Sequence, residues 1–246
     1  MILQDVGMLA VDSNRTKLYL HQMIEQQLLP SYVLYMEDSG AVTPEARVLA
    51  GDIRTEKTKK GTRKLNPDVS AATLLEEHGI PYQRIPTMDP NSDQVVKLVA
   101  ACAQPILIYS GPGGAILGNR LLAAGKRFLH VHSGVLPYYR GSTTVYYSLL
   151  NEGNCGATVF VMDAHIDTGP VILKRTYPAP DDRTTIDLYY DPFIRARLLV
   201  EVLKEYARGG KLTYEAHDPA VGETYFIIHP VLKHIAILAH AGPKDE

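Results

Sequence analysis

Residues 127–141 read RFLHVHSGVLPYYRG, and residues 127–132 predict a β-strand that enters the segment after it. His130 and His132 stand two positions apart, so both imidazoles would project from one face of that strand. They occupy its carboxyl end, which is where ligands bind in open parallel sheets. A single histidine there is more often structural, but two on one face favour a functional site.

Short apolar strands alternate with helical patterns on both sides of this stretch. The sequence predicts strands over residues 3–10, 32–36, 106–109, 157–162 and 171–177, and helices over 16–28, 70–78, 93–103, 142–150 and 185–208. Ser13 or Asn14 would cap the first helix, and Pro192 would kink the last one. We therefore expect an α/β fold with a Rossmann-like, mostly parallel sheet flanked by helices. This domain would span residues 1–210, and residues 211–246 would form a C-terminal extension with a strand and a short helix.

Composition narrows the class of protein. The 246 residues are 46% hydrophobic and 21% charged, as in an ordinary globular protein, and the net charge of −2 gives no overall attraction to nucleic acid or to an anionic membrane. Two cysteines suit a reducing compartment. The N-terminus does not resemble a signal peptide, and no apolar run approaches the ~18–20 residues of a membrane span. We expect a cytoplasmic protein without membrane or nucleic-acid partners.

Two other segments admit a plain and a functional interpretation. Residues 54–64, RTEKTKKGTRK, are favoured as a solvated loop, and a loop that contacts the phosphates of a nucleotide-bearing substrate is the alternative. Residues 222–230 predict a strand and a turn that pack over the sheet. The alternative for this segment is a homodimer contact through Tyr225, Phe226 and the two isoleucines that follow.

Two loops add to the histidine pair. Residues 163–170, DAHIDTGP, form a turn that Asp167 would cap and in which Gly169 would take a positive φ. A carboxylate on such a turn can orient an imidazole, as in a general base with its acidic partner. Residues 110–118, SGPGGAILG, lack phosphate-loop spacing, and Gly113 and Gly114 instead suggest close approach of the backbone to a flat ligand.

Three pieces in this order resemble the folate-dependent formyltransferases: residues 114–117 (GAIL), 130–141 (HVHSGVLPYYRG) and 163–170. The family pattern reads roughly Asn-x-His-x-Ser-Leu-Leu-Pro-x-Tyr-x-Gly, followed further along by Asp-x-Gly. The likeness covers about residues 100–178, while the first hundred residues match only in their order of strands and helices.

The resemblance implies an enzyme that moves a formyl group from 10-formyltetrahydrofolate to an amine. His132 would help to deprotonate the amine and to stabilise the tetrahedral intermediate, and Asp167 would orient it. We expect a ring nitrogen of His132 and a carboxyl oxygen of Asp167 to meet at the edge of one pocket. The pterin ring would meet main chain at Gly114, Ile116, Leu117, Asp163 and His165, and the substrate-binding side chains would be Tyr138 and Arg140.

His130 departs from the family, which has asparagine at this position. We expect His130 to keep the hydrogen-bond donor role toward the oxyanion. His130→Asn would then retain substantial activity, and His130→Ala would lose roughly 10²-fold or more.

The acceptor is expected to be a small amine. Family members that act on methionyl-tRNA carry a further C-terminal domain, for which this chain has no room, and its net charge is slightly negative. Glycinamide ribonucleotide and an amino sugar on a nucleotide remain, and the sugar is favoured because Tyr138, Tyr139, Tyr146 and Tyr147 could stack on a sugar or base.

Other functions stay open. His130, His132 and Asp167 could instead form the two-histidine, one-carboxylate site of a metal-dependent enzyme. The chain could also be a non-catalytic relative that binds folate or a nucleotide. Hydrolysis of 10-formyltetrahydrofolate, with water in place of the amine, is a further variant.

Overall fold

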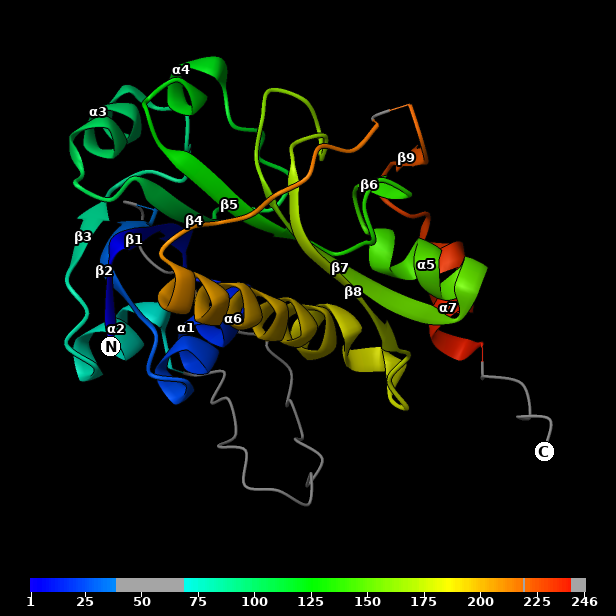
Figure 1. Cartoon of the computed structure of the whole chain (residues 1–246). Coiled ribbons are helices and arrows are strands. Elements are labelled where there is room, and N and C mark those ends of the chain that lie inside the picture. The colour runs from blue at the N-terminus through cyan, green and yellow to red at the C-terminus, as the bar shows by residue number, and fades with distance from the viewer. Residues whose placement is uncertain (39–68, 219, 240–246) are drawn as a thin grey trace.

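A seven-stranded sheet in the order β3-β2-β1-β4-β5-β7-β8 forms the centre of the molecule (Figure 1). The computed structural model describes residues 1–38, 69–218 and 220–239. The first five strands in the chain run parallel to one another: β1 (Ile2–Val11), β2 (Leu29–Met36), β3 (Tyr82–Ile85), β4 (Ile106–Ser110) and β5 (Arg127–His132). Strand β7 (Asn154–Val161) is antiparallel to both β5 and β8 (Val171–Pro178). The predicted, mostly parallel sheet is confirmed.

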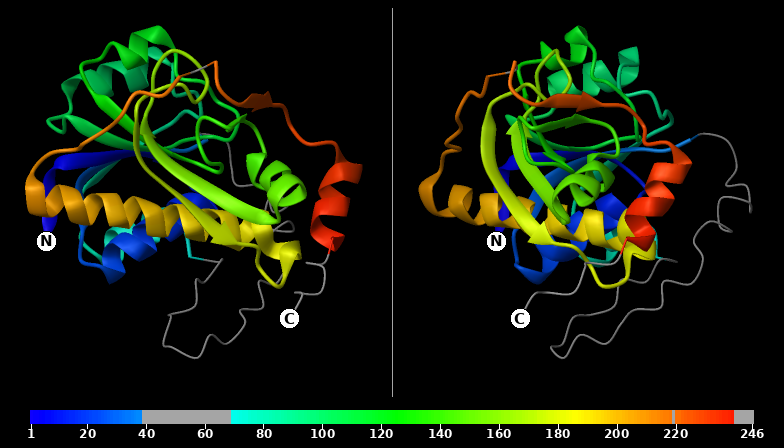
Figure 2. Two further views of the ribbon diagram at one scale, coloured as in Figure 1. Left: turned by 45° about the vertical axis from the view of Figure 1, so that its right-hand side comes forward. Right: turned by 90° about the vertical axis from the view of Figure 1, so that its right-hand side faces the viewer.

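Helices cover both faces of this sheet (Figures 1 and 2). One face packs on α1 (Asn14–Glu25), α2 (Ala71–Glu77) and α6 (Asp191–Gly209), and the other lies under α3 (Asp93–Ala101) and α4 (Asn119–Leu122). Alternate residues of β1 divide between two cores, with Met8 and Ala10 facing the first layer and Leu9 and Val11 the second. Burial on both faces explains why the central strands are almost wholly apolar.

Serine caps set the start of three helices. Ser13, Ser70 and Ser92 each accept a hydrogen bond from the backbone N–H three residues later. The predicted cap at Ser13 is therefore confirmed for α1.

The last long helix begins later than predicted, and the kink expected at Pro192 stays a prediction. Residues Arg183–Thr185 (η2) form a 3₁₀ turn and Ile186–Tyr190 (η3) a π-helical turn, and α6 begins only at Asp191. Pro192 thus stands in the first turn of α6, where its missing N–H leaves no helical hydrogen bond unmade.

A smaller group of elements closes the carboxyl end of β5 (Figure 2). Strand β6 (Tyr139–Gly141) pairs in parallel with β9 (Glu223–Tyr225) of the C-terminal segment. Helix α5 (Thr144–Glu152) and helix α7 (Pro230–Leu238) share a third core around Val145, Tyr146 and Ile228. Residues 223–238, which come after the predicted boundary at residue 210, pack beside β6 and α5. A division of the chain at residue 210 stays a prediction.

The basic segment 54–64 lies outside the described residues, so both interpretations of it stay predictions. Of the predicted dimer contact, Tyr225 packs against the rings of Tyr139 and Tyr147 and Ile228 is buried, while Phe226 and Ile227 are exposed. None of the helices in the described part of the chain is long and apolar enough to cross a membrane.

Candidate active site

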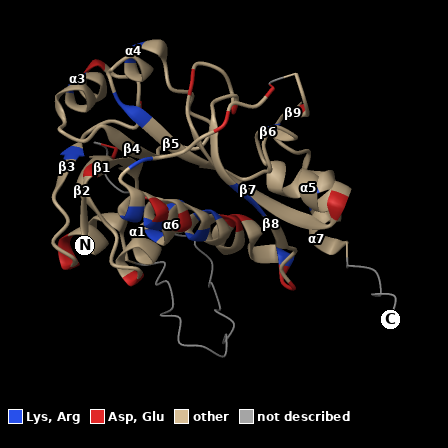
Figure 3. Cartoon of the chain, in the orientation of Figure 1, with Lys and Arg blue, Asp and Glu red and all other residues tan. Residues whose placement is uncertain are grey.

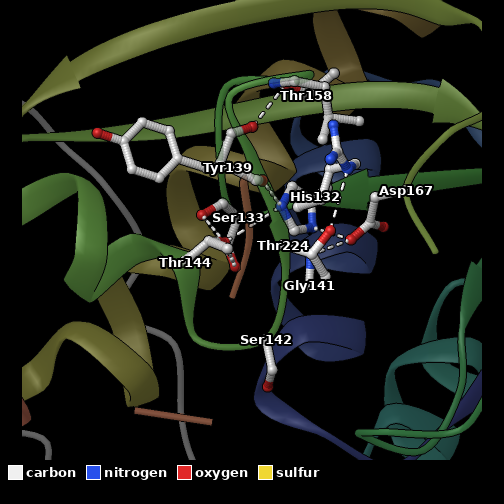
Figure 4. Close-up of polar contacts among 12 residues, drawn as sticks. His132, Ser133, Tyr139, Gly141, Ser142, Thr144, Thr158, Asp167 and Thr224 are labelled. Carbon is white, nitrogen blue, oxygen red and sulfur yellow. Dashed lines mark hydrogen bonds and ion pairs between the residues drawn. The ribbon is translucent and has the colours of Figure 1, made fainter. Parts of the chain in front are cut away.

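His132 and Asp167 meet beside the carboxyl end of β5 (Figure 4). His132 is the last residue of β5, and Asp167 comes from the connection between β7 and β8. The distance from His132 Nδ1 to Asp167 Oδ2 is 3.3 Å, and the two side chains are 5% and 12% exposed. The sequence analysis expected this contact between a ring nitrogen and a carboxyl oxygen, and the structure contains it.

The second ring nitrogen of His132 faces the protein as well. His132 Nε2 lies 2.6 Å from the carbonyl oxygen of Tyr139 and 3.2 Å from Thr144 Oγ1. A carbonyl can only accept, and the Thr144 hydroxyl already donates to the Ser133 carbonyl at 2.7 Å. Nε2 therefore carries a hydrogen. Because Nδ1 lies beside the Asp167 carboxylate, both ring nitrogens of His132 face acceptors.

Asp167 also contacts strand β6. Its Oδ2 also accepts a hydrogen bond from the Gly141 backbone N–H at 2.8 Å. The pair thus holds both ends of the short strand, Tyr139 through the imidazole and Gly141 through the carboxylate (Figure 4).

The backbone of the Asp-Thr-Gly-Pro turn differs from the expectation. The positive φ belongs to Asp167, at 55°, and Gly169 does not take one. Gly169 is needed for another reason, since a β-carbon there would overlap the Val161 carbonyl oxygen. At the start of the connection Asp163 accepts from the His165 backbone N–H and from the Thr168 hydroxyl.

His130 precedes His132 on the same face of β5, in an apolar setting. Its ring meets the Phe160 ring edge-on with centroids 5.9 Å apart, and the Tyr109 ring at 6.0 Å. Burial, followed by the positive charges of Arg195 and Arg15, holds the pKa of the imidazole well below its usual value. His130 Nδ1 lies 3.3 Å from the Tyr109 carbonyl oxygen, which can only accept, so this nitrogen carries the hydrogen.

Asn91, which the sequence did not mark as a site residue, bonds to the backbone of the predicted pterin-contacting loop, residues 114–118. Asn91 donates to the Ile116 carbonyl at 2.9 Å and accepts from the Gly118 N–H at 2.6 Å. Ile116 is exposed and Leu117 is buried between these contacts. Gly114 has a φ of 77° and room for a ligand, since nothing lies within 4 Å of a β-carbon built there. No sequence motif marks Asn91, because its partners are backbone atoms.

The two predicted substrate-binding residues lie in different surroundings. Tyr138 is 55% exposed. Arg140 is buried, and its guanidinium donates to the carbonyl oxygens of Pro137, Val221 and Gly222 and to the Thr224 hydroxyl. Its observed partners are therefore the C-terminal segment, and a contact with substrate stays a prediction.

The alternative of a metal site finds no support in this geometry. Within residues 1–38, 69–218 and 220–239, no group of three or more His, Cys, Asp or Glu side chains could hold a metal ion. Both nitrogens of His132 and one of His130 already face protein acceptors.

The sequence model of the family described as Formyl transferase matches residues 53–193, which is more than half of the chain. The chain belongs to the formyl transferase family. The match includes both histidines, Asp167 and the loop around Gly114. That His130 stands at the family's asparagine position stays a prediction.

The curated relatives are longer than this chain. A methionyl-tRNA formyltransferase of Roseiflexus sp. (strain RS-1) is 33% identical over 141 residues, which are 55% of this chain and 43% of that protein. The chain spans about half the length of the curated relatives that it matches.

Solved structures share the fold of this chain. Glycinamide ribonucleotide transformylase 1 from Symbiobacterium toebii has a TM-score of 0.58 at 17% identity, covering 87% of this chain and 93% of that one. An N-formyltransferase from Helicobacter canadensis, solved with folinic acid and dTDP-3-aminofucose, has a TM-score of 0.55 at 16% identity, covering 91% and 71%.

Proposed function

We propose that the chain is an N-formyltransferase that moves the formyl group of 10-formyltetrahydrofolate to the amine of a small molecule. The observation that carries the proposal is the 3.3 Å contact between His132 and Asp167 at the carboxyl end of β5, in a member of the formyl transferase family. Binding at that end of a parallel sheet is the general rule for this architecture.

The pair supplies an electrostatic environment for the reaction. Attack of an amine on a formyl carbon puts negative charge on the formyl oxygen, and fixed positive charge in an enclosed site stabilises it. His132 is held by Asp167, Tyr139 and Thr144, so this polar ring does not have to reorganise during the reaction. Its contacts support stabilisation of the intermediate more than removal of a proton.

The loop around residues 113–118 fits the donor substrate. Exposed Ile116 and the open side of Gly114 offer an apolar surface and backbone groups to a flat ring, and Asn91 fixes their position. Asp163 and His165 are exposed on the second predicted loop. We propose that both loops take part in binding the pterin.

An amino sugar on a nucleotide is the acceptor that we favour. Tyr138 offers an exposed ring on the segment that follows His132, while Tyr139 and Tyr146 are buried and Tyr147 packs on Tyr225. The Helicobacter canadensis neighbour was solved with a nucleotide-linked amino sugar. Methionyl-tRNA is the second candidate because of the 33% identity to an enzyme of that name. Against it, acidic and basic residues are interleaved along α6 (Figure 3).

Product analysis tests the proposal. The full chain would be incubated with 10-formyltetrahydrofolate and, in separate reactions, a dTDP-linked amino sugar, glycinamide ribonucleotide and methionyl-tRNA. Mass spectrometry should show one acceptor heavier by the mass of CO. Asp167→Asn should lower the rate by about 10²-fold or more, because the carboxylate that holds His132 is lost, while exposed Glu205→Gln should leave it unchanged. Formate as the sole product, or no product, would contradict the proposal.

A further inference from the structure

We propose that His130, through its Nε2 atom, is the general base that removes the proton from the acceptor amine. The inference rests on the proposed formyl transfer. It assigns His130 a task opposite to that of the asparagine that the family is predicted to have at this position, because an asparagine amide donates a hydrogen and cannot take up a proton at neutral pH.

The tautomer of His130 follows from its contact with the Tyr109 backbone. His130 Nδ1 faces the Tyr109 carbonyl oxygen at 3.3 Å, so Nδ1 bears the hydrogen. A neutral imidazole carries a single N–H, which leaves the lone pair on Nε2. A ring in this state accepts at Nε2 and cannot donate there.

The surroundings of His130 favour the neutral form of its ring. His130 is packed between the rings of Tyr109 on β4 and Phe160 on β7. The charged and titratable groups around it are Arg195 of α6, Arg15 of α1, His132 of β5 and the Tyr109 phenol, and the first three oppose its protonation. A low pKa keeps the base form populated through neutral pH.

The two histidines differ in whether a ring nitrogen is left without a protein partner among the described residues. The His130 side chain is half-buried, and no described residue bonds to its Nε2. His132 offers no such atom, because its Nδ1 is taken by Asp167 and its Nε2 by Tyr139 and Thr144. Among the described residues, Nε2 of His130 is therefore the one nitrogen of the two imidazoles without a protein partner.

The proton balance of the reaction is complete with this assignment. The amine nitrogen bonds to the formyl carbon, and the resulting N–H⁺ gives its proton to His130 Nε2. The bond from the formyl carbon to N10 of the folate then breaks, and N10 leaves with the proton that His130 carries. The product is a formamide plus tetrahydrofolate, and His130 returns to its starting state.

The tautomer can be measured without any turnover. Long-range ¹H–¹⁵N spectra of the ¹⁵N-histidine-labelled full chain at pH 7 should show His130 with a protonated Nδ1 and an unprotonated Nε2. His132 should show a hydrogen on Nε2, which faces the Tyr139 carbonyl. Single substitutions assign the signals. A His130 ring with its hydrogen on Nε2 would overturn the proposal, whether or not an acceptor amine is known.

The kinetic arm tests the base. His130→Ala and His130→Asn should both lower the single-turnover rate by about 10²–10⁴-fold. Substituted imidazoles added to His130→Ala should restore activity, with rates that rise with the basicity of the neutral imidazole. The acid limb of kcat/KM for the wild type should lie below pH 6.5, where exposed histidine titrates. Exposed His78→Asn is the matched control and should behave as wild type.

The outcomes separate the two proposals. Near-wild-type activity of His130→Asn would overturn the base assignment and support the donor role of an amide. If the activity of His130→Ala restored by added imidazoles instead rose with the concentration of the protonated imidazolium, the base assignment would also be overturned. Inactivity of the wild type with every amine, together with the expected tautomer, would refute formyl transfer itself.

Discussion

The turn that carries Asp167 shows how a single backbone position decides the geometry of the site. Asp167 has a φ of 55°, and its carboxylate reaches His132 and the Gly141 N–H from this conformation. Two residues later Gly169 passes so near the Val161 carbonyl that no side chain fits. The turn is thus fixed by close packing of backbone on backbone.

Gly169→Ala is expected to displace this turn. The added methyl group meets backbone atoms, which cannot rotate away, and overpacking of this kind costs roughly 1–3 kcal/mol in unfolding free energy. A shift of Asp167 by about 1 Å should lower the transfer rate by about 10²-fold. Denaturant melts and single-turnover rates measure the two effects. Gly209→Ala, where nothing lies within 4 Å of the new carbon, is the control and should change neither.

Spacing and chemical type were enough to nominate residues 130, 132 and 167, because strand periodicity and a carboxylate on a turn are visible in sequence. The partners that give each residue its role were not visible. His132 and His130 bind the carbonyl oxygens of Tyr139 and Tyr109, and any residue type offers such an oxygen. This is why the expected donor role of His130 now competes with the base role inferred from the tautomer.

At the scale of elements, α6 depends on a buried ion pair in its first turns. Arg195 Nη1 lies 3.1 Å from Asp191 Oδ2, with side chains 9% and 12% exposed. Arg195 is also near the buried Tyr19 of α1, so the pair lies between α6 and α1, two of the three helices that cover one face of the sheet. An ion pair in this position is costly to break, because one partner alone leaves an uncompensated charge.

Asp191→Ala should lower the unfolding free energy by about 3–5 kcal/mol, since the guanidinium of Arg195 would stay buried without its carboxylate. The double variant Asp191→Leu/Arg195→Met should recover most of this loss, because both charges are removed together. Urea denaturation followed by circular dichroism measures both. The exposed pair Glu205–Arg208 is the control, and Glu205→Ala should change stability by no more than about 0.5 kcal/mol. Equal losses in the single and double variants would contradict this account.

Elements long enough to show periodicity could be predicted from sequence, whereas short ones could not. Strand β5 matches its predicted bounds, and the two strands around the Asp-Gly turn are present as β7 and β8. Strand β6 and helix α4 have three and four residues, which is less than the window in which a repeat of two or 3.6 can be recognised. Their positions depend on partners far away in the chain.

At the scale of the whole molecule, the end of the described chain is tied to the site. Arg140 holds the backbone at Val221 and Gly222, and Gly141 and Gly222 allow the two segments to approach without β-carbons. Tyr225 then stacks on Tyr139, the residue whose carbonyl faces His132. The C-terminal segment therefore supports β6, the strand whose backbone contacts His132 and Asp167.

Arg140→Ala should release residues 221–226 and loosen β6. Hydrogen–deuterium exchange should increase both in this segment and in residues 139–141, and the transfer rate should fall by about 10-fold or more through the loss of alignment at Tyr139. Arg208→Ala, an exposed arginine of α6, is the control and should alter neither readout. A drop in affinity for the acceptor with unchanged exchange would instead favour the predicted substrate contact of Arg140.

The pairing of β6 with β9 has a consequence for the chain as it is made. More than eighty positions separate Arg140 from Thr224, so a polypeptide still being translated carries both histidines and Asp167 long before it can complete this pairing. Catalytic competence should accordingly be gained only after residues 223–225 have been synthesised. Nonsense mutations after α6 should be as damaging to activity as those inside the sheet.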